Sequence, residues 1–336
     1  EITTHMILNG ITKTLLAPGP TQIKPEVFKV MSNYAHPGMR VFSETRKEIH
    51  RRLQGWMDRD EHQVLMTATP STGFMEATIT NLTKRGERGF VIAHGKFGNR
   101  FIEIAEATGR IVDSLTVSDE QWGHGFSPEE VANALSGGAY TFLCFQQNET
   151  SSGVAYTEEQ VRSIVTVARA HNPDIIIVMD GVSGIGAHDL SFKTIDIDAI
   201  VLGSQKALGV SSGITYLSLS PRAISRMFAV AGYTKNLDSF RKEPDRSAYL
   251  DTFEIQQRVR YISLLRLIAG EGVGAPAIFH ELSILASLRL MDEEGGKGAV
   301  VTRHEKLAVY AREAVTRMKL ETLSRDPYFS NSVTPL

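Results

Sequence analysis

The sequence contains a single cysteine, Cys144, and no apolar stretch long enough to cross a bilayer. One cysteine excludes a disulfide framework within the chain and favours a reducing compartment. Cys144 lies in an apolar run, which predicts a core position. The N-terminus begins at Glu1 and lacks the basic-then-apolar pattern of a secretion signal. We therefore expect a cytoplasmic protein.

Neither sign of charge is in excess, since 36 lysines and arginines face 38 aspartates and glutamates. This balance does not favour nucleic acid or an anionic membrane as a partner. The ten histidines show no metal-ligand spacing, so we assign no metal site. A nucleotide-binding protein is disfavoured as well, because neither G-x-G-x-x-G after a strand nor G-x-x-x-x-G-K-[ST] occurs.

Short β-rich runs alternate with helical patterns from about residue 62 to residue 220. The predicted strands are residues 63–67, 89–93, 110–117, 140–145, 174–179, 198–202 and 213–219. Two of the helices between them begin with capping boxes, one from Ser127 to Glu130 and one from Thr157 to Gln160. The alternation predicts an α/β fold whose mostly parallel sheet carries helices on both faces.

After residue 250 the strand signals stop and long helical periods follow, over residues 252–269, 276–291 and 302–318. We therefore divide the chain in two. Residues 1–250 form an N-terminal segment and a large α/β domain. Residues 251–336 form an interdomain helix and part of a smaller C-terminal domain.

Ligands of open α/β sheets collect at the carboxyl ends of the strands. Ser71 and Thr72 follow the first strand and open a helix, where backbone N–H groups suit a phosphate, although capping alone also explains such residues. Phe97 follows the second strand between two glycines and is either a stacking platform or a core residue. Asp180 ends a fully apolar strand, where a carboxylate needs a cationic partner. Lys206 follows the next strand and is either a surface residue that begins a loop or a neutral, nucleophilic amine in a site.

These features together match the needs of pyridoxal phosphate. Its phosphate suits a helix N-terminus, its pyridine nitrogen an anion, its ring an aromatic face, and its aldehyde an amine. On these residues the sequence resembles the class V aminotransferases of fold type I, which include the alanine-glyoxylate and serine-glyoxylate (serine-pyruvate) aminotransferases. The resemblance runs through APGPT at 17–21, NETSSG at 148–153, GSQKAL at 203–208 and SVTP at 332–335.

The resemblance implies a role for each candidate site residue. Lys206 is the Schiff-base lysine, and Asp180 pairs with the pyridine nitrogen. The other implied cofactor contacts are Ser71, Thr72 and Gln205 at the phosphate, Phe97 and Val182 on the ring, and Thr150 near the phenolic oxygen. Tyr249 and Thr252 are implied to reach the partner's phosphate in a homodimer with shared sites. Gly19 and Arg40 are implied substrate contacts, and for Arg40 a surface role is an equal alternative.

The implied reaction moves an amino group from an alanine- or serine-type donor to a 2-oxo acid such as glyoxylate or pyruvate, in ping-pong order. Alternatives are a class V transaminase acting on 2-aminoethylphosphonate, phosphoserine or aspartate, a lyase or decarboxylase, and a catalytically silent dimeric homologue. A cysteine desulfurase is disfavoured because Cys144 lies inside a predicted strand. Family members continue beyond the point equivalent to Leu336 into an arginine that clamps the substrate carboxylate, so no residue of this sequence is assigned that role.

Overall fold

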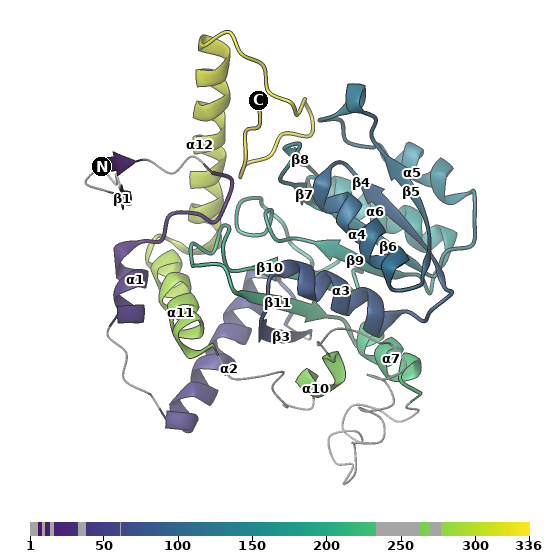
Figure 1. The fold of residues 1–336 in the computed structure, drawn as a ribbon, viewed down its shortest axis with the longest axis horizontal. Helices are drawn as coiled ribbons and strands as arrows, with labels where there is room; N and C mark the ends of the chain where they lie inside the picture. The colour runs from purple at the N-terminus through teal and green to yellow at the C-terminus, as the bar shows by residue number, and fades with distance from the viewer. Residues whose placement is uncertain are drawn as a thin grey trace.

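A seven-stranded sheet forms the centre of the protein (Figure 1). The structure is a computed structural model that describes residues 6–8, 11–13, 17–32, 38–60, 62–232, 263–268 and 277–336. The strands of the sheet are β3 (Gln63–Ala68), β4 (Arg88–Ala93), β5 (Ile111–Thr116), β6 (Phe142–Gln146), β9 (Ile176–Asp180), β10 (Ala199–Gly203) and β11 (Ile214–Leu219). Their order across the sheet is β3-β11-β10-β9-β6-β4-β5.

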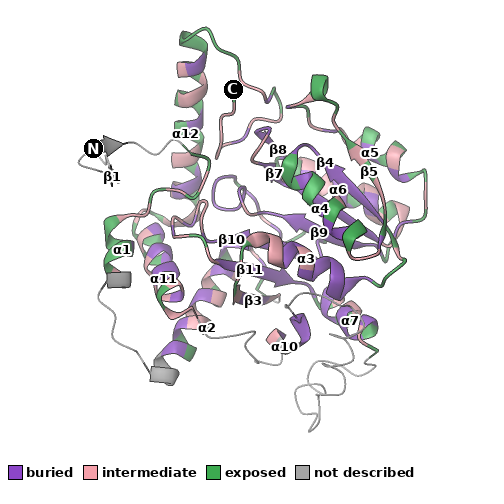
Figure 2. Cartoon of the chain, in the orientation of Figure 1, coloured by how far each residue is buried: buried purple, intermediate pink, exposed green. Residues whose placement is uncertain are grey.

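The sheet is parallel except for β11, which runs antiparallel to both β10 and β3. All the predicted strands are present, and their ends lie within two residues of the predicted ones. The central strands β6, β9 and β10 are buried along their whole length, as Figure 2 shows. Strands covered on both faces need apolar side chains at every position, which is why their sequences do not alternate.

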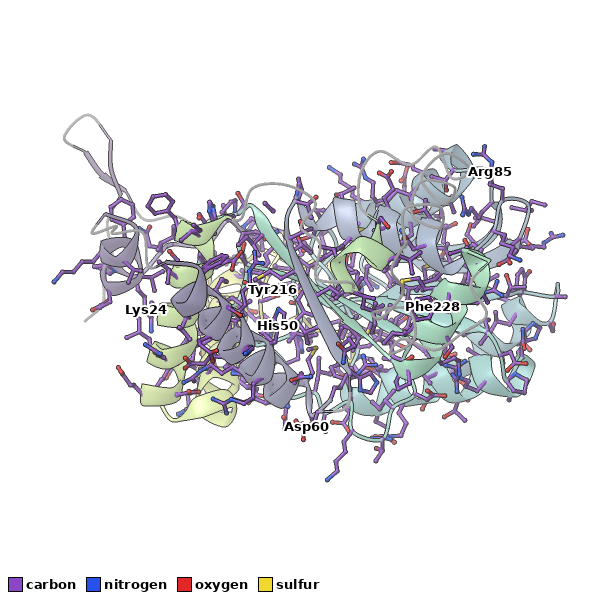
Figure 3. All side chains as sticks on the ribbon, turned by 90° about the horizontal axis from the view of Figure 1, so that it is seen from below. Lys24, His50, Asp60, Arg85, Tyr216 and Phe228 are labelled. Carbon is purple, nitrogen blue, oxygen red and sulfur yellow. The ribbon has the colours of Figure 1, made fainter. Side chains whose placement is uncertain are left out.

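Helices cover both faces of this sheet. The helices that follow or precede its strands are α1 (Pro25–Ser32), α2 (Gly38–Met57), α3 (Ser71–Leu82), α4 (Lys96–Ala107), α5 (Pro128–Leu135), α6 (Glu158–His171), α7 (Pro221–Val230), α10 (Leu264–Ile268), α11 (Ile278–Glu293) and α12 (Gly296–Arg317). Side chains of α3, α4, α7 and α10 form one buried cluster, and those of α2, α5, α6 and α11 form the other. Figure 3 labels one residue of each cluster, Phe228 of α7 and Tyr216 of β11.

The two predicted capping boxes are confirmed. The Ser127 hydroxyl accepts the Glu130 N–H at 3.2 Å, and the Glu130 carboxylate accepts the Ser127 N–H at 2.8 Å. Thr157 and Gln160 make the same reciprocal pair at the start of α6. Each box satisfies donors that the first turn of a helix leaves unpaired. Cys144 is buried in β6, as predicted.

The C-terminal helices pack against the N-terminal ones. Glu281 on α11 is 2% exposed and forms an ion pair with Arg46 of α2, with 2.7 Å between carboxylate and guanidinium. The predicted start of the last helix at residue 302 is wrong, because α12 already begins at Gly296 and buries Val300 and Val301. Most of the helix predicted over residues 252–269 lies outside the described residues. The division at residue 250 remains a prediction.

Several shorter segments accompany the central sheet and its helices. Strands β1 (Met6–Leu8) and β2 (Ile11–Lys13) form a hairpin, and a 3-10 turn spans Asp119–Gln121. Strands β7 (Asn148–Glu149) and β8 (Val154–Ala155) form a second hairpin after β6. The C-terminal segment lies along β8, where the Ala155 N–H donates to the Tyr328 carbonyl at 2.9 Å. No helix within the described ranges is long and apolar enough to cross a membrane.

Candidate active site

The candidate residues gather at one edge of the sheet because of its topology. Strands β4, β6, β9 and β10 are parallel, so their carboxyl ends share that edge. Strand β3 runs in the same direction, since β11 is antiparallel to both β3 and β10. The starts of α3 and α4, the β7–β8 hairpin and the turns after β9 and β10 therefore face the same space.

Lys206 lies in the turn after β10, beneath the N-terminal segment 17–21. Its Nζ donates to the carbonyl of Pro18 at 2.7 Å. The Thr21 hydroxyl donates to the Lys206 carbonyl at 3.1 Å, which fastens the segment over the turn. Gly19 has a φ of +136°, and a Cβ there would lie 2.9 Å from Lys206 Nζ. Only glycine therefore fits between the segment and the lysine.

Burial lowers the pKa of the Lys206 amine, while the negative charges of Asp180 and Glu149 act in the opposite direction. An amine with a lowered pKa loses its proton more readily and becomes a nucleophile or a base. Lys206 is thus a half-buried amine at the carboxyl edge of the sheet, and its catalytic role remains a prediction.

Asp180 is the last residue of β9 and is 6% exposed. Its Oδ1 accepts the Val182 N–H at 2.8 Å. Burial raises the pKa of the carboxyl to about 7, and the charge of Glu149 adds to this, whereas the Val182 N–H and the charge of Lys206 oppose it. A cation placed beside a buried carboxyl with a raised pKa stabilises its ionised form. The site is therefore suited to a protonated ring nitrogen.

Ser71, Val182 and Gln205 surround Gly203 at the end of β10. A Cβ on Gly203 would lie 2.7 Å from Gln205 Oε1, 2.8 Å from Ser71 Oγ and 2.9 Å from Val182 Cγ1. The Ser71 hydroxyl is buried and has no hydrogen-bond partner among the described residues. Pro70 precedes α3 and has no side-chain oxygen that could cap it. The first turn of α3 thus combines an unpartnered hydroxyl with a positive helix end, which suits a phosphate.

The start of α4 differs from that of α3. Its N–H groups from Phe97 and Gly98 donate to Glu149 Oε2 at 3.0 and 2.9 Å, and its Lys96 N–H donates to Ser151 Oγ at 2.9 Å. Phe97 is 42% exposed, so it is not a core residue. Its backbone is held in place while its ring remains open to a flat ligand.

The remaining predicted residues divide into two groups. Thr72 and Thr150 are half-buried, the first beside Ser71 in α3 and the second in the turn between β7 and β8. Arg40 lies in α2, but its side chain lies outside the described residues, as do Tyr249 and Thr252. The predicted contacts of these three residues therefore remain predictions.

The sequence interpretation assigned no role to Glu149 or to Gly203. Glu149 stands in the quoted NETSSG stretch, but its partners in α4 are about fifty positions away in the sequence. Gly203 precedes the lysine by three residues, and only the crowding around its Cα shows that a side chain would displace Ser71 and Gln205. Neither signal is readable from local sequence.

Comparison with known proteins agrees with this geometry. The family model described as "Aminotransferase class-V" matches residues 14–251. The chain is 26% identical to the soluble hydrogenase 42 kDa subunit of Anabaena cylindrica, over 95% of this chain and 77% of that protein. It is 25% identical to the serine-glyoxylate aminotransferase of Arabidopsis thaliana, over 95% of this chain and 74% of that protein.

Among solved structures, the chain is similar to the aspartate aminotransferase of subgroup IV from Thermus thermophilus. The TM-score is 0.74 and the identity 25%, over 95% of this chain and 81% of that one. The match of the fold confirms the predicted fold type I architecture, and the family match covers more than half of the sequence. The chain therefore belongs to the class V aminotransferase family.

Proposed function

We propose that this protein transfers an amino group from an alanine- or serine-type donor to a 2-oxo acid such as glyoxylate or pyruvate, with Lys206 as its catalytic amine. The observation that carries the proposal is the half-buried Lys206 with its lowered pKa, placed within electrostatic reach of the buried Asp180. The family depends on pyridoxal phosphate. The name of the Arabidopsis relative supports the choice of glyoxylate as acceptor.

The residues at the sheet edge fit this cofactor. The unpartnered Ser71 hydroxyl and the start of α3 would hold its phosphate, together with Thr72 and Gln205. The exposed ring of Phe97 and the side chain of Val182 would hold the two faces of its ring, and Thr150 would lie near its phenolic oxygen. Bound there, the cofactor supplies an aldehyde that accepts the donor's amino group and a ring that withdraws electrons from the substrate α-carbon.

The protein's own groups would manage charge and protons. Asp180 would keep the pyridine nitrogen protonated, since a cation satisfies this buried carboxylate. The Lys206 amine would take the proton from the donor's α-carbon and deliver it to the cofactor carbon that carried the aldehyde, and it would move a proton in the opposite direction when the 2-oxo acid reacts. Because the Pro18 carbonyl already binds Lys206 Nζ, segment 17–21 would orient the amine and limit access of water to it. The same groups serve donor and acceptor in turn, which is ping-pong order.

A homodimer with shared sites is part of this proposal. It depends on Tyr249 and Thr252, which would reach the phosphate of the partner's cofactor and which lie outside the described residues. Gly19 lies against Lys206, next to the space where a substrate would enter, and supports its assignment as a substrate contact. The name of the hydrogenase subunit adds no function to the proposal, since no residue of the site is explained by it.

A screen of amino donors tests the proposed reaction. Protein loaded with pyridoxal phosphate is mixed with one donor at a time, and the spectrum shows whether the aldehyde form converts to the amine form. We expect alanine or serine to convert it and glyoxylate or pyruvate to restore it. Conversion only by phosphoserine, aspartate or 2-aminoethylphosphonate would overturn the substrate class. Conversion by no donor would overturn the aminotransferase proposal.

Replacing Gly203 by alanine tests the phosphate site. The new Cβ would lie less than 3.0 Å from Ser71 Oγ, Gln205 Oε1 and Val182 Cγ1. We expect the dissociation constant of pyridoxal phosphate, measured by absorbance titration, to rise by about tenfold or more, which corresponds to about 1.4 kcal/mol. Gly298→Ala is the matched control, because a Cβ there meets nothing within 4 Å. Equal affinities in the two variants would place the phosphate elsewhere.

A further inference from the structure

The β7–β8 hairpin carries a carboxylate that the proposed reaction does not use. Glu149 is fully buried, with 0% exposure. Its Oε2 accepts the N–H groups of Phe97 and Gly98, at 3.0 and 2.9 Å. Its Oε1 accepts the N–H and the hydroxyl of Ser151, at 2.9 and 2.7 Å. All these donors are neutral, so the charge is stabilised by hydrogen bonds and by the positive end of α4.

This arrangement requires a carboxylate rather than another polar group. Both oxygens of Glu149 face hydrogen-bond donors only. A glutamine amide would turn an NH₂ group toward donors on one side or the other and lose two bonds in either orientation. Gly95 lets the β7–β8 hairpin come close to the start of α4, because a Cβ at this position would lie 2.3 Å from Ser151 Oγ. The β7–β8 hairpin therefore places a carboxylate against the start of α4, and Gly95 leaves the room for it.

Glu149 and Ser151 form a cap on the first turn of α4. This cap distinguishes α4 from α3, which begins at the same edge of the sheet. Glu149 and Ser151 together accept all three N–H groups from Lys96 to Gly98, and the Asn99 N–H donates to the Gly95 carbonyl at 3.0 Å. The start of α4 thus has no donor left for a phosphate. The start of α3, with its unpartnered Ser71 hydroxyl, is open to one.

We propose that Glu149 is a positioning residue of the active site, which closes α4 to phosphate, fixes the backbone of Phe97, and places a negative charge near Lys206 and Asp180. This inference rests on the proposed function. The charge of Glu149 raises the pKa of both Asp180 and Lys206. The charge of Glu149 therefore favours the protonated states of Asp180 and Lys206, while its hydrogen bonds hold the backbone of Phe97.

The test compares wild type with Glu149→Gln, both loaded with pyridoxal phosphate. The first readout is the pH midpoint of the spectral change of the bound cofactor. We expect the midpoint to move to lower pH by about half a unit or more, because the lost negative charge no longer stabilises the protonated lysine nitrogen. The second readout is the cofactor dissociation constant, which we expect to rise about tenfold.

Asp198→Asn is the matched control. Asp198 is also 0% exposed, but it precedes β10 at the opposite edge of the sheet, where it binds Arg169 and Ser220. This variant should lower the thermal stability of the protein and leave the spectral midpoint unchanged. If the spectral midpoint shifts in both variants, the effect of Glu149→Gln is explained by general destabilisation of the protein, and the inference is overturned. A midpoint of Glu149→Gln equal to that of wild type would overturn it as well.

Ser151→Ala keeps the test decisive if Glu149→Gln does not fold. It removes one bond to Glu149 and the acceptor of the Lys96 N–H, but it leaves the charge. We expect an unchanged midpoint and a cofactor dissociation constant raised about threefold. An unchanged dissociation constant would show that the cap does not position the site. Failure of wild type to bind pyridoxal phosphate would instead overturn the proposed function, and this inference with it.

Discussion

Replacing Lys206 by alanine is expected to abolish the covalent link between protein and cofactor and to lower kcat by at least about 10³-fold. Proton transfer by a positioned side chain contributes about 10² to 10⁴ to a rate, and the variant also loses the amine that holds the aldehyde. The check is reduction with borohydride followed by mass analysis of the peptides. Wild type should carry the reduced adduct on the peptide that contains Lys206, and the variant should carry none.

Two comparisons make this result specific. Lys193→Ala removes an exposed lysine from the loop before β10 and should retain both the adduct and the activity. A small primary amine added to Lys206→Ala should restore part of the proton transfer, because it supplies the missing base. An adduct that persists in Lys206→Ala on another lysine would remove Lys206 from the proposed role. Full turnover without an adduct would do the same.

The centre of the sheet could be predicted from sequence because β6, β9 and β10 are buried on both faces. Residues 174–179 are almost continuously apolar, a pattern that fits β9 and few other structures of that length. The parallel arrangement then followed from the helices between the strands. The exception, β11, has the same buried composition as its neighbours, so its reversed direction has no signal in its own residues.

The limits of sequence reading are clearest at the two helix starts. The small polar residues Ser71 and Thr72 predicted a phosphate site at the start of α3, but nothing in the local sequence excluded the start of α4, which also follows a strand. The structure separates them, because Glu149 occupies one and not the other. The same holds for Lys206, whose partner at Pro18 is a backbone carbonyl 188 positions away. Contacts of this range depend on the fold rather than on any local pattern.

Helix ends after residue 250 were harder to predict for a different reason. Gly295 and Gly296 suggest a break in the helical pattern, and the structure does end α11 just before them. Glycine also allows an immediate restart, since Gly295 adopts a φ of +116° as the residue before α12. The turn between the two helices is therefore much shorter than the sequence pattern indicated.

Replacing Asp180 by asparagine should have effects of opposite sign on activity and on stability. The amide has nearly the shape of the carboxylate and can still accept the Val182 N–H, but it has no charge to keep the pyridine nitrogen protonated. Removal of a preorganised charge from a water-poor site costs about 10² to 10³ in kcat, and we expect a loss of at least that size in steady-state assays. Full activity of the variant would contradict the proposed role of Asp180.

The stability effect follows from the pKa of the carboxyl in the cofactor-free protein. Folding raises that pKa from its ordinary value of 3.8 to about 7, mainly by burial. The folded state thus binds a proton that the unfolded state releases between these values, and wild type loses stability as the pH rises from about 4 to about 7. Asparagine does not titrate. Its variant should therefore nearly equal wild type at pH 4 and exceed it by up to about 4 kcal/mol above pH 7, since one pKa unit corresponds to about 1.4 kcal/mol.

Denaturant unfolding of the cofactor-free proteins across this pH range measures the difference. Pyridoxal phosphate should reverse the order of stability, because its ring nitrogen gives the wild-type carboxylate the cation that burial leaves missing. A variant that is less stable than wild type at pH 8 without cofactor would show that Asp180 already has a cationic partner in the protein. In that case Asp180 would be part of a structural ion pair, and the ring nitrogen would need another acid.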